Sequence, residues 1–196
     1  MKRLLPAAGF LILLASPLAS ASSWEIDSNH TSPGFSVTHM MVSTVRGSFG
    51  KTTGTLELDE KDVTKSKVEI SIDVTSVDTR VADRDNDLRS DHFFDAAKNP
   101  AITFKSTKVE SAGKGKLKVT GDLTMRGITK PVTLDVTGPS DEFKSPWGQI
   151  TRGASATAKI SRKDWGLVWN KTLEKGGVLV SDEVTLEIEA EFHPKK

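Results

Sequence analysis

The alternating stretch Val68-Glu69-Ile70-Ser71-Ile72-Asp73-Val74 decides the fold class of this 196-residue chain. Apolar and polar side chains follow one another at every step, which is the period-two pattern of a strand with one buried and one solvated face. The same alternation recurs in three further sets of apolar residues: Leu117, Val119, Leu123 and Met125; Val132, Leu134 and Val136; and Val184, Leu186, Ile188, Ala190 and Phe192. One-sided alternation is typical of antiparallel sheets, so we expect an all-β fold.

Less regular strands complete the expected set. We expect one through Phe35, Val37 and His39, and others over 45–58, 102–109 and 150–160. The total is about eight strands, with turn signals at 113–115, 126–127 and 138–139 between neighbours. Short turns favour hairpins in an up-and-down antiparallel meander, and eight such strands can close into a barrel, which removes exposed edges. A sandwich of two sheets is the alternative, because periodicity does not show closure.

One segment, Arg80 to Ala97, breaks the alternation. It is dense in charge, and Asn99-Pro100 follows it, where a helix would stop. We therefore expect one helical excursion after the third strand of the barrel. Its apolar residues are too unevenly spaced for one helical stripe, so a helix followed by a tighter turn is the alternative, with Phe93 and Phe94 plugging the segment against the barrel.

The first 21 residues have the features of a signal peptide. Met1 to Arg3 is basic, Leu4 to Leu18 is largely apolar, and Ala19-Ser20-Ala21 is a small-x-small cleavage site. Cleavage would leave Ser22 as the first residue of a single domain, 22–196, in the periplasm or secreted. A membrane anchor is the alternative, but the apolar run falls short of the roughly 20 residues that span a bilayer.

Composition excludes several classes of function. The chain has no cysteine, which removes lipoprotein acylation, disulfides and thiolate chemistry. Without Lys2 and Arg3, 25 basic residues stand against 26 acidic ones, and the charges are well mixed. Nucleic-acid binding would need a basic face with interleaved aromatic residues, so we expect no nucleic-acid partner.

Several motifs together resemble one protein family. The central run is Arg84-Asp85-Asn86-Asp87-Leu88-Arg89-Ser90-Asp91-His92-Phe93-Phe94-Asp95, followed by Pro100-Ala101-Ile102-Thr103-Phe104-Lys105-Ser106. Other motifs occur in matching order: His30, Phe35 and His39 leading to Val45-Arg46-Gly47, then 121–132, then 161–167. These motifs are similar to those of the YceI-like family of bacterial polyisoprenoid-binding proteins, and the similarity covers essentially the whole chain after the signal peptide.

The resemblance implies a lipocalin-like barrel, periplasmic or secreted, that encloses an isoprenoid chain such as a quinone tail or a polyprenyl phosphate. Three positions depart from the family pattern. The family commonly has His, Phe and Tyr where this chain has Asp87, Trp165 and Trp24. Size and polarity therefore differ at these three positions.

Small side chains on one expected strand indicate a hollow interior. Ala154, Ala156 and Ala158 share one face, which leaves space that a ligand can occupy in an eight-stranded barrel. The alternative is that large neighbours such as Phe104 and Met125 fill that space. The candidate ligand-binding residues are Phe35, Val37, His39, Phe49, Ile70, Ile72, Phe93, Phe94, Phe104, Met125, Ala154, Ala156, Ala158 and Trp169.

The histidines and acidic residues form no convincing catalytic or metal pattern. His30, His39 and His92 lack the short spacings that bring two ligands together, so structural roles are favoured and no metal, cofactor or catalytic residue is expected. The acidic run 83–91 resembles a calcium loop, but Leu88 occupies the place of the required Gly. We expect a binding protein for carriage, storage or buffering of lipid. An enzyme acting on an isoprenoid or quinone-type lipid is the alternative.

Two tryptophans near a glycine pair suggest how the protein meets its partners. Trp165 and Trp169 precede Gly176-Gly177 and are compatible with three roles: a cavity lip, a patch that contacts a membrane or a second subunit, or core packing. The expected partners are accordingly an isoprenoid lipid ligand, a transient membrane contact and a second copy of the chain in a homodimer.

Overall fold

The computed structural model describes residues 21–174 and 176–196, so the predicted signal peptide lies, apart from Ala21, outside the described residues. Strands make up most of the structure. They are β1 (Ser22–Ile26), β2 (Ser32–His39), β3 (Ser43–Phe49), β4 (Thr52–Leu58), β5 (Lys67–Asp73), β6 (Val77–Asp78), β7 (Ala101–Ser111), β8 (Lys116–Met125), β9 (Ile128–Thr137), β10 (Phe143–Lys144), β11 (Ile150–Ser161) and β12 (Val180–Pro194). The helical elements are α1 (Ala82–Arg89) and the 3-10 turns η1 (Val63–Lys65), η2 (Val74–Ser76) and η3 (Arg162–Trp165).

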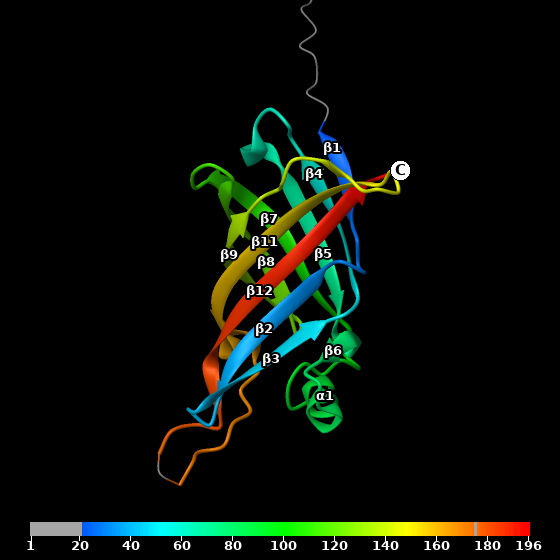
Figure 1. Ribbon diagram of the computed structural model, residues 1–196. Coiled ribbons are helices and arrows are strands. Elements are labelled where there is room, and N and C mark those ends of the chain that lie inside the picture. Colours follow the sequence, from blue (N-terminus) through cyan, green and yellow to red (C-terminus); the bar gives the residue numbers. More distant parts are fainter. Residues whose placement is uncertain (1–20, 175) are drawn as a thin grey trace, which may run out of the picture.

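Eight of these strands close into an antiparallel barrel (Figure 1). From β4 onward each barrel strand pairs with the next one along the chain, through β5, β7, β8, β9, β11 and β12. The ring is completed by β1, which pairs with β4 on one side and with the last strand, β12, on the other. The predicted eight-stranded up-and-down barrel is therefore confirmed, and the sandwich is excluded.

The chain breaks twice near its beginning, at 27–31 and at 50–51, and the second break falls inside a stretch that is predicted as one strand. The stretch 45–58, predicted as one strand, is the two strands β3 and β4, separated at Gly50 and Lys51. The reason is a set of hydrogen bonds to η2: the N–H of Gly50 donates to Ser76 O (3.3 Å), and the N–H of Lys51 donates to Ser76 Oγ (3.1 Å). Since these donors leave the sheet ladder, β3 turns away from the barrel and pairs with β2 and β6.

The last strand holds both parts of the broken first strand. Over its 15 residues, β12 pairs first with β2 and then, through Phe192 to Pro194, with β1. Residues 27–31, between β1 and β2, interrupt the ladder at this point. We call residues 27–31 together with 191–193 the seam, because they join the beginning of the barrel to its end.

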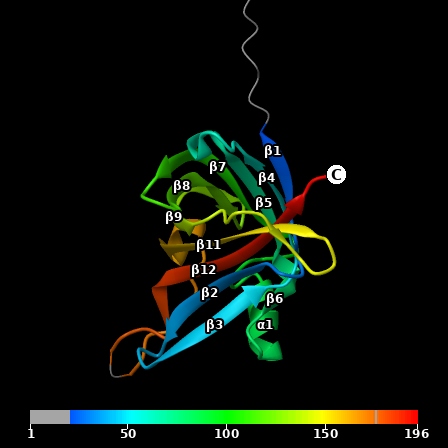
Figure 2. The same cartoon turned by 45° about the horizontal axis from the view of Figure 1, so that its top comes forward.

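The helical excursion follows the third barrel strand, β5, as expected, but its helix is shorter than the predicted span. Helix α1 ends at Arg89, and the remainder of 80–97 forms turns in which the N–H groups of Phe94 and Ala96 donate to Leu88 O and Arg89 O. These turns reverse the chain, which brings Phe93 and Phe94 into the buried core as the predicted plug. Figure 2 shows α1 and β6 together at the outer edge of β3.

The barrel interior is filled from one side by large side chains. On β8 the inward residues Leu117, Val119, Leu123 and Met125 are all buried. A smaller cluster of Trp24, Leu58 and Phe192 lies where β1, β4 and β12 meet. In the described part of the chain, no helix has the length and apolarity needed to cross a membrane.

Candidate ligand-binding cavity

An apolar cavity of about 290 Å³ lies inside the barrel. Small-molecule sites typically occupy about 300–1,000 Å³, so this cavity is close to the lower end of that range. Most of its lining residues are apolar and come from all eight barrel strands. Two titratable side chains, Lys67 and Arg162, stand among the lining residues of the described chain.

Most of the sequence-predicted lining residues border this cavity, although their contact with a lipid stays a prediction. Those that border it are Phe35, Val37, Phe49, Ile70, Ile72, Phe93, Phe94, Phe104, Met125, Ala154 and Ala156. They come from six strands and from the turns after α1, and Phe49 packs at 5.9 Å from Phe35 and 5.8 Å from Phe94 between ring centroids. The aromatic group therefore forms one wall that closes the end of the barrel near α1.

Three predicted residues do not border the cavity, which corrects the sequence analysis. His39 ends β2 beside a bulge in β12 between Val180 and Val184, beyond the regular ladder. Ala158 packs against the hydrophobic core but is not among the residues that border the cavity. Trp169 packs against the core cluster, with its ring centroid 6.4 Å from that of His92 and 5.5 Å from that of Phe93.

The alanine face of β11 meets the apolar face of β12. Ala154 is paired with Ala190, and Ala156 with Ile188. Both alanines border the cavity, so the space is open on the β11 side and bounded by larger residues elsewhere. The structure thus favours the hollow alternative over the filled one at Ala154 and Ala156.

Several residues that line the cavity were not predicted from the sequence. Val132, Leu134, Val136, Val184, Leu186, Ile188, Ala190 and Phe192 all border it. These residues alternate with polar ones in the sequence. Because alternate residues of a strand share one face, the pattern that predicts the strands also predicts that these side chains face the interior.

Arg162 is a buried charge that the sequence analysis did not single out. Its Nε donates to Ser181 O (2.9 Å), its Nη1 donates to Trp169 O (2.9 Å) and Leu167 O, and its Nη2 lies 3.3 Å from Asp182 Oδ1. Burial lowers the pKa of this guanidinium, and the nearby Asp182 opposes that change. Its donors are thus engaged in fixing the chain between η3 and β12, which makes Arg162 a structural residue at this end of the cavity.

The two tryptophans differ in position. Trp165 is almost fully buried and donates from Nε1 to Leu123 O (3.1 Å), so it belongs to the core rather than to an exposed patch. Trp169 is half-buried. The large exposed apolar side chains near this end are instead Met41, Val42 and Val168, and membrane contact and dimerisation stay predictions.

The three positions that depart from the family pattern lie outside the cavity lining. Trp24 and Trp165 are buried in the core clusters, and Asp87 bonds to His92 at 2.9 Å. None of the three is among the residues that border the cavity in the described chain. The substitutions therefore change the packing around the barrel and leave the cavity wall as it is.

A closed antiparallel barrel around an apolar cavity defines the class: the chain has the architecture of a barrel binding protein. A model of the YceI-like domain matches residues 24–192, and the chain belongs to the YceI-like family. A UPF0312 protein of Vibrio parahaemolyticus is 41% identical over 174 residues, which cover 85% of this chain and 89% of the relative. A UPF0312 protein of Shewanella denitrificans is 40% identical over 157 residues, which cover 79% and 82%.

Solved structures share the fold. The YCEI protein of Campylobacter jejuni matches with a TM-score of 0.69 and 32% identity, over 81% of this chain and 90% of that one. BcnA of Burkholderia cenocepacia has a TM-score of 0.72 at 23% identity, over 85% and 98%. A polyisoprenoid-binding domain from Saccharophagus degradans, implicated in plant cell wall breakdown, has a TM-score of 0.62 at 15% identity, over 89% and 99%. At these lower identities the last two show the fold alone.

Proposed function

We propose that this barrel binds a long apolar isoprenoid lipid, of the quinone-tail or polyprenyl-phosphate type, in its interior. The observation that carries the proposal is the apolar cavity inside the barrel, bordered by the small residues Ala154 and Ala156. The polyisoprenoid-binding domain of the same fold supports the choice of ligand class. An apolar chain suits such a cavity because the wall offers little hydrogen bonding.

The energetics of burial make such a ligand sufficient without strong polar contacts. At about 0.8 kcal/mol for each buried CH₂-sized group, a five-carbon unit gains roughly 3–4 kcal/mol before costs. Association and ordering remove an estimated 4–15 kcal/mol, depending on the treatment. A few units therefore give useful affinity, and selectivity depends on the length and shape of the cavity.

The proposed place of action is the periplasm, or outside the cell, after removal of 1–21. Strand β1 begins at Ser22, directly after the expected cleavage site, and this supports the proposal. The intact mass of the exported protein tests it. A mass that begins at Ser22 is expected, and a mass in the periplasmic fraction that retains Met1 to Ala21 would contradict it.

The identity of the cargo is tested on protein purified from its native compartment without detergent. Lipids are extracted into organic solvent and identified by mass spectrometry, with an equal amount of another periplasmic protein as the control. The expected result is an isoprenoid lipid in stoichiometric proportion to the barrel. A preparation that contains only phospholipids, at the level of the control, would overturn the isoprenoid proposal.

Carriage and buffering of the lipid make different demands on the protein. A carrier accelerates transfer of a labelled isoprenoid between donor and acceptor vesicles in proportion to protein concentration. A storage or buffering protein withdraws the label from donor vesicles without delivering it. We expect carriage or buffering rather than catalysis, and turnover of a polyprenyl or quinone substrate by the pure protein would favour the enzyme instead.

A further inference from the structure

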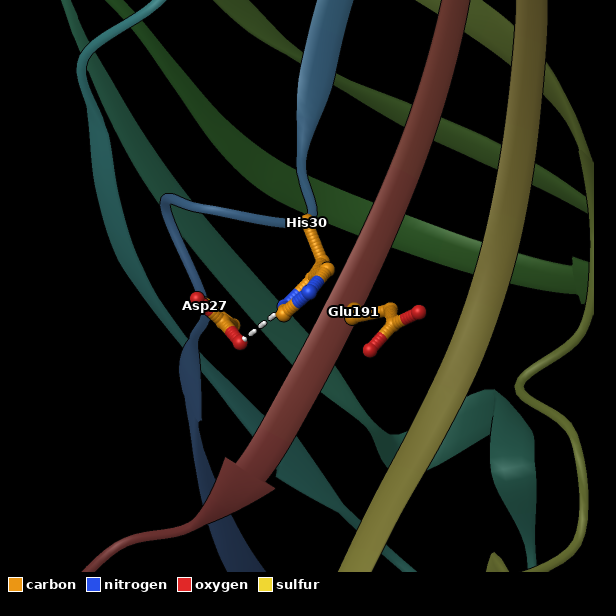
Figure 3. A group of neighbouring side chains, drawn as sticks. All are labelled: Asp27, His30 and Glu191. Atoms are coloured by element: carbon orange, nitrogen blue, oxygen red, sulfur yellow. Dashed lines mark hydrogen bonds and ion pairs between the residues drawn. The ribbon is translucent and has the colours of Figure 1, made fainter. Parts of the chain in front are cut away.

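The seam between the first and last strands brings together polar side chains that are far apart in the sequence. Asp27 and His30 lie in the segment between β1 and β2, and Glu191 lies on β12 (Figure 3). Two backbone groups hold these segments together: the N–H of Asp27 donates to Glu191 O (2.8 Å), and the N–H of Glu191 donates to Thr31 Oγ1 (3.2 Å). The three side chains are therefore placed by the ladder that closes the barrel.

The three side chains converge on a small volume. His30 Nδ1 lies 2.7 Å from Asp27 Oδ2, and one ligand atom from each of Asp27, His30 and Glu191 lies within 4.8 Å of the other two. Around a tetrahedral ion with bonds of about 2.0 Å, ligand atoms lie about 3.3 Å apart. The 2.7 Å distance is shorter than this value, and the 4.8 Å limit leaves room for it. The side chain of His30 is 64% exposed, so its ring is free to make the small adjustment and solvent reaches the site.

Asp27 is held in place by groups other than the proposed ligands. His193 Nε2 lies 2.7 Å from Asp27 Oδ2, its Nδ1 lies 3.0 Å from Ile150 O, and the N–H of Asn29 donates to Asp27 Oδ1 (2.9 Å). Because a carboxylate and a carbonyl only accept, both ring nitrogens of His193 donate. Such supporting hydrogen bonds are typical around metal ligands.

The geometry points to a binding site for a divalent transition-metal ion of the Zn²⁺ class at Asp27, His30 and Glu191, with His193 orienting Asp27. One imidazole and two carboxylates suit Zn²⁺ and similar ions, whereas Ca²⁺ and Mg²⁺ prefer all-oxygen sites with more ligands. Three protein ligands leave the fourth position to water. An ion here would tie the beginning of the barrel to its end.

The site is separate from the cavity. Ala190 and Phe192, on either side of Glu191, border the cavity, and alternate residues of a strand face opposite sides. Glu191 therefore faces the outside of the barrel. This separation makes the proposal independent of the lipid proposal.

Isothermal titration of Zn²⁺ into tag-free, chelator-treated protein at about pH 8 tests the site. Co²⁺ absorption serves as a second measurement, since its visible bands report the coordination geometry. The wild-type chain is expected to bind one ion, and His30→Gln and Glu191→Gln are each expected to weaken binding at least about tenfold. His39→Gln and His92→Gln are the matched controls, because these histidines lie away from the seam, and both should bind as the wild type does.

The melting temperature provides a readout of where the ion acts. Zn²⁺ should raise the melting temperature of the wild type and of both controls. It should leave the melting temperatures of His30→Gln and Glu191→Gln unchanged. The variants carry half-buried or exposed substitutions, and circular dichroism verifies their fold before titration. Absence of saturable binding to the wild type, equal binding by His30→Gln, or loss of binding in a control variant would each overturn the proposal.

Discussion

Strands β8 and β11 both alternate, both pair antiparallel in the same barrel, and yet build opposite kinds of wall. The inward residues of β8 are large: Leu117, Val119, Leu123 and Met125. Those of β11 include the small residues Ala154 and Ala156, and the residues of both strands border the same cavity. Alternation thus decides which side chains enter the barrel, whereas their size decides whether the interior is packed or hollow. In this protein the large β8 side chains are buried, and the small β11 side chains leave the space of the cavity.

The largest expected effect is on the packed side. Leu123→Ala removes buried methyl groups from β8 and should lower the free energy of unfolding by about 2–5 kcal/mol. Urea denaturation measures the change. The control is Asp122→Ala, an exposed neighbour on the same strand, which should change stability by no more than about 0.5 kcal/mol. A Leu123→Ala loss as small as that of the control would mean that β8 is not the packed wall.

The next effect separates binding from stability on the hollow side. Ala156→Phe places a ring in the cavity. The variant should still melt cooperatively, but the amount of isoprenoid bound per protein should fall about tenfold or more. In a filled core the same change would overpack and cost about 1–3 kcal/mol. Thermal melting and lipid extraction measure the two quantities.

The exposed neighbour Thr157 provides the control for this experiment, and Thr157→Phe should alter neither quantity much. Ala158 gives a second comparison, since it shares the alanine face of β11 but is not among the residues that border the cavity. Ala158→Phe should lower stability without a selective loss of lipid. A strongly destabilised Ala156→Phe protein, or one that carries lipid normally, would show that β11 does not form the hollow wall.

A smaller effect concerns pH and lies outside the interior. Hydrogen bonds from the Thr75 hydroxyl and N–H, at 2.6 and 2.8 Å, lower the pKa of Asp73 at the start of η2. A carboxyl whose pKa is lower in the folded state stabilises the fold at pH values above its pKa in the unfolded state. That stabilisation is lost as the pH falls through its pKa in the folded state. Urea denaturation below about pH 4 should therefore show a steeper loss for the wild type than for Asp73→Asn. Parallel pH profiles would contradict this role.

The smallest expected effect is that of chelation on the cargo. Because Asp27, His30 and Glu191 are not among the residues that border the cavity, removing divalent metal with a chelator should leave the amount of bound lipid unchanged. His39→Gln should likewise leave it unchanged, since His39 does not border the cavity. Extraction and mass spectrometry before and after chelation provide the measurement. Loss of lipid on chelation would mean that a metal ion acts in the cavity itself.

Most of the barrel strands could be predicted because each strand and turn shows a pattern within a short stretch of sequence. The alternation in β5, β8, β9 and β12 determines each strand and its inward face, and the turn residues at 113–115 and 126–127 separate consecutive strands. The breaks in the first two barrel strands could not be predicted in this way. The break between β3 and β4 depends on Ser76 in the distant turn η2, which accepts hydrogen bonds from the N–H groups of Gly50 and Lys51.

The cavity-lining residues could be predicted where strand alternation alone shows which side chains face inward. Ala154 and Ala156 follow from their small size and shared face, whereas Trp169 and His39 required knowledge of where the barrel ends and of the bulge in β12. Strand periodicity carries no information about such ends, because it describes a single strand and not its neighbours.

The sequence by itself determined the all-β class, the number of barrel strands, the inward faces and the family, since each depends on residues close together in the chain. Only the tertiary structure decided how the barrel closes and what its seam assembles. Asp27 and His30 meet Glu191 because the first strand pairs with the last, and no pattern in either segment refers to the other. Closure is a property of long-range pairing, so both the enclosed cavity and the seam site appear only when the ring is complete.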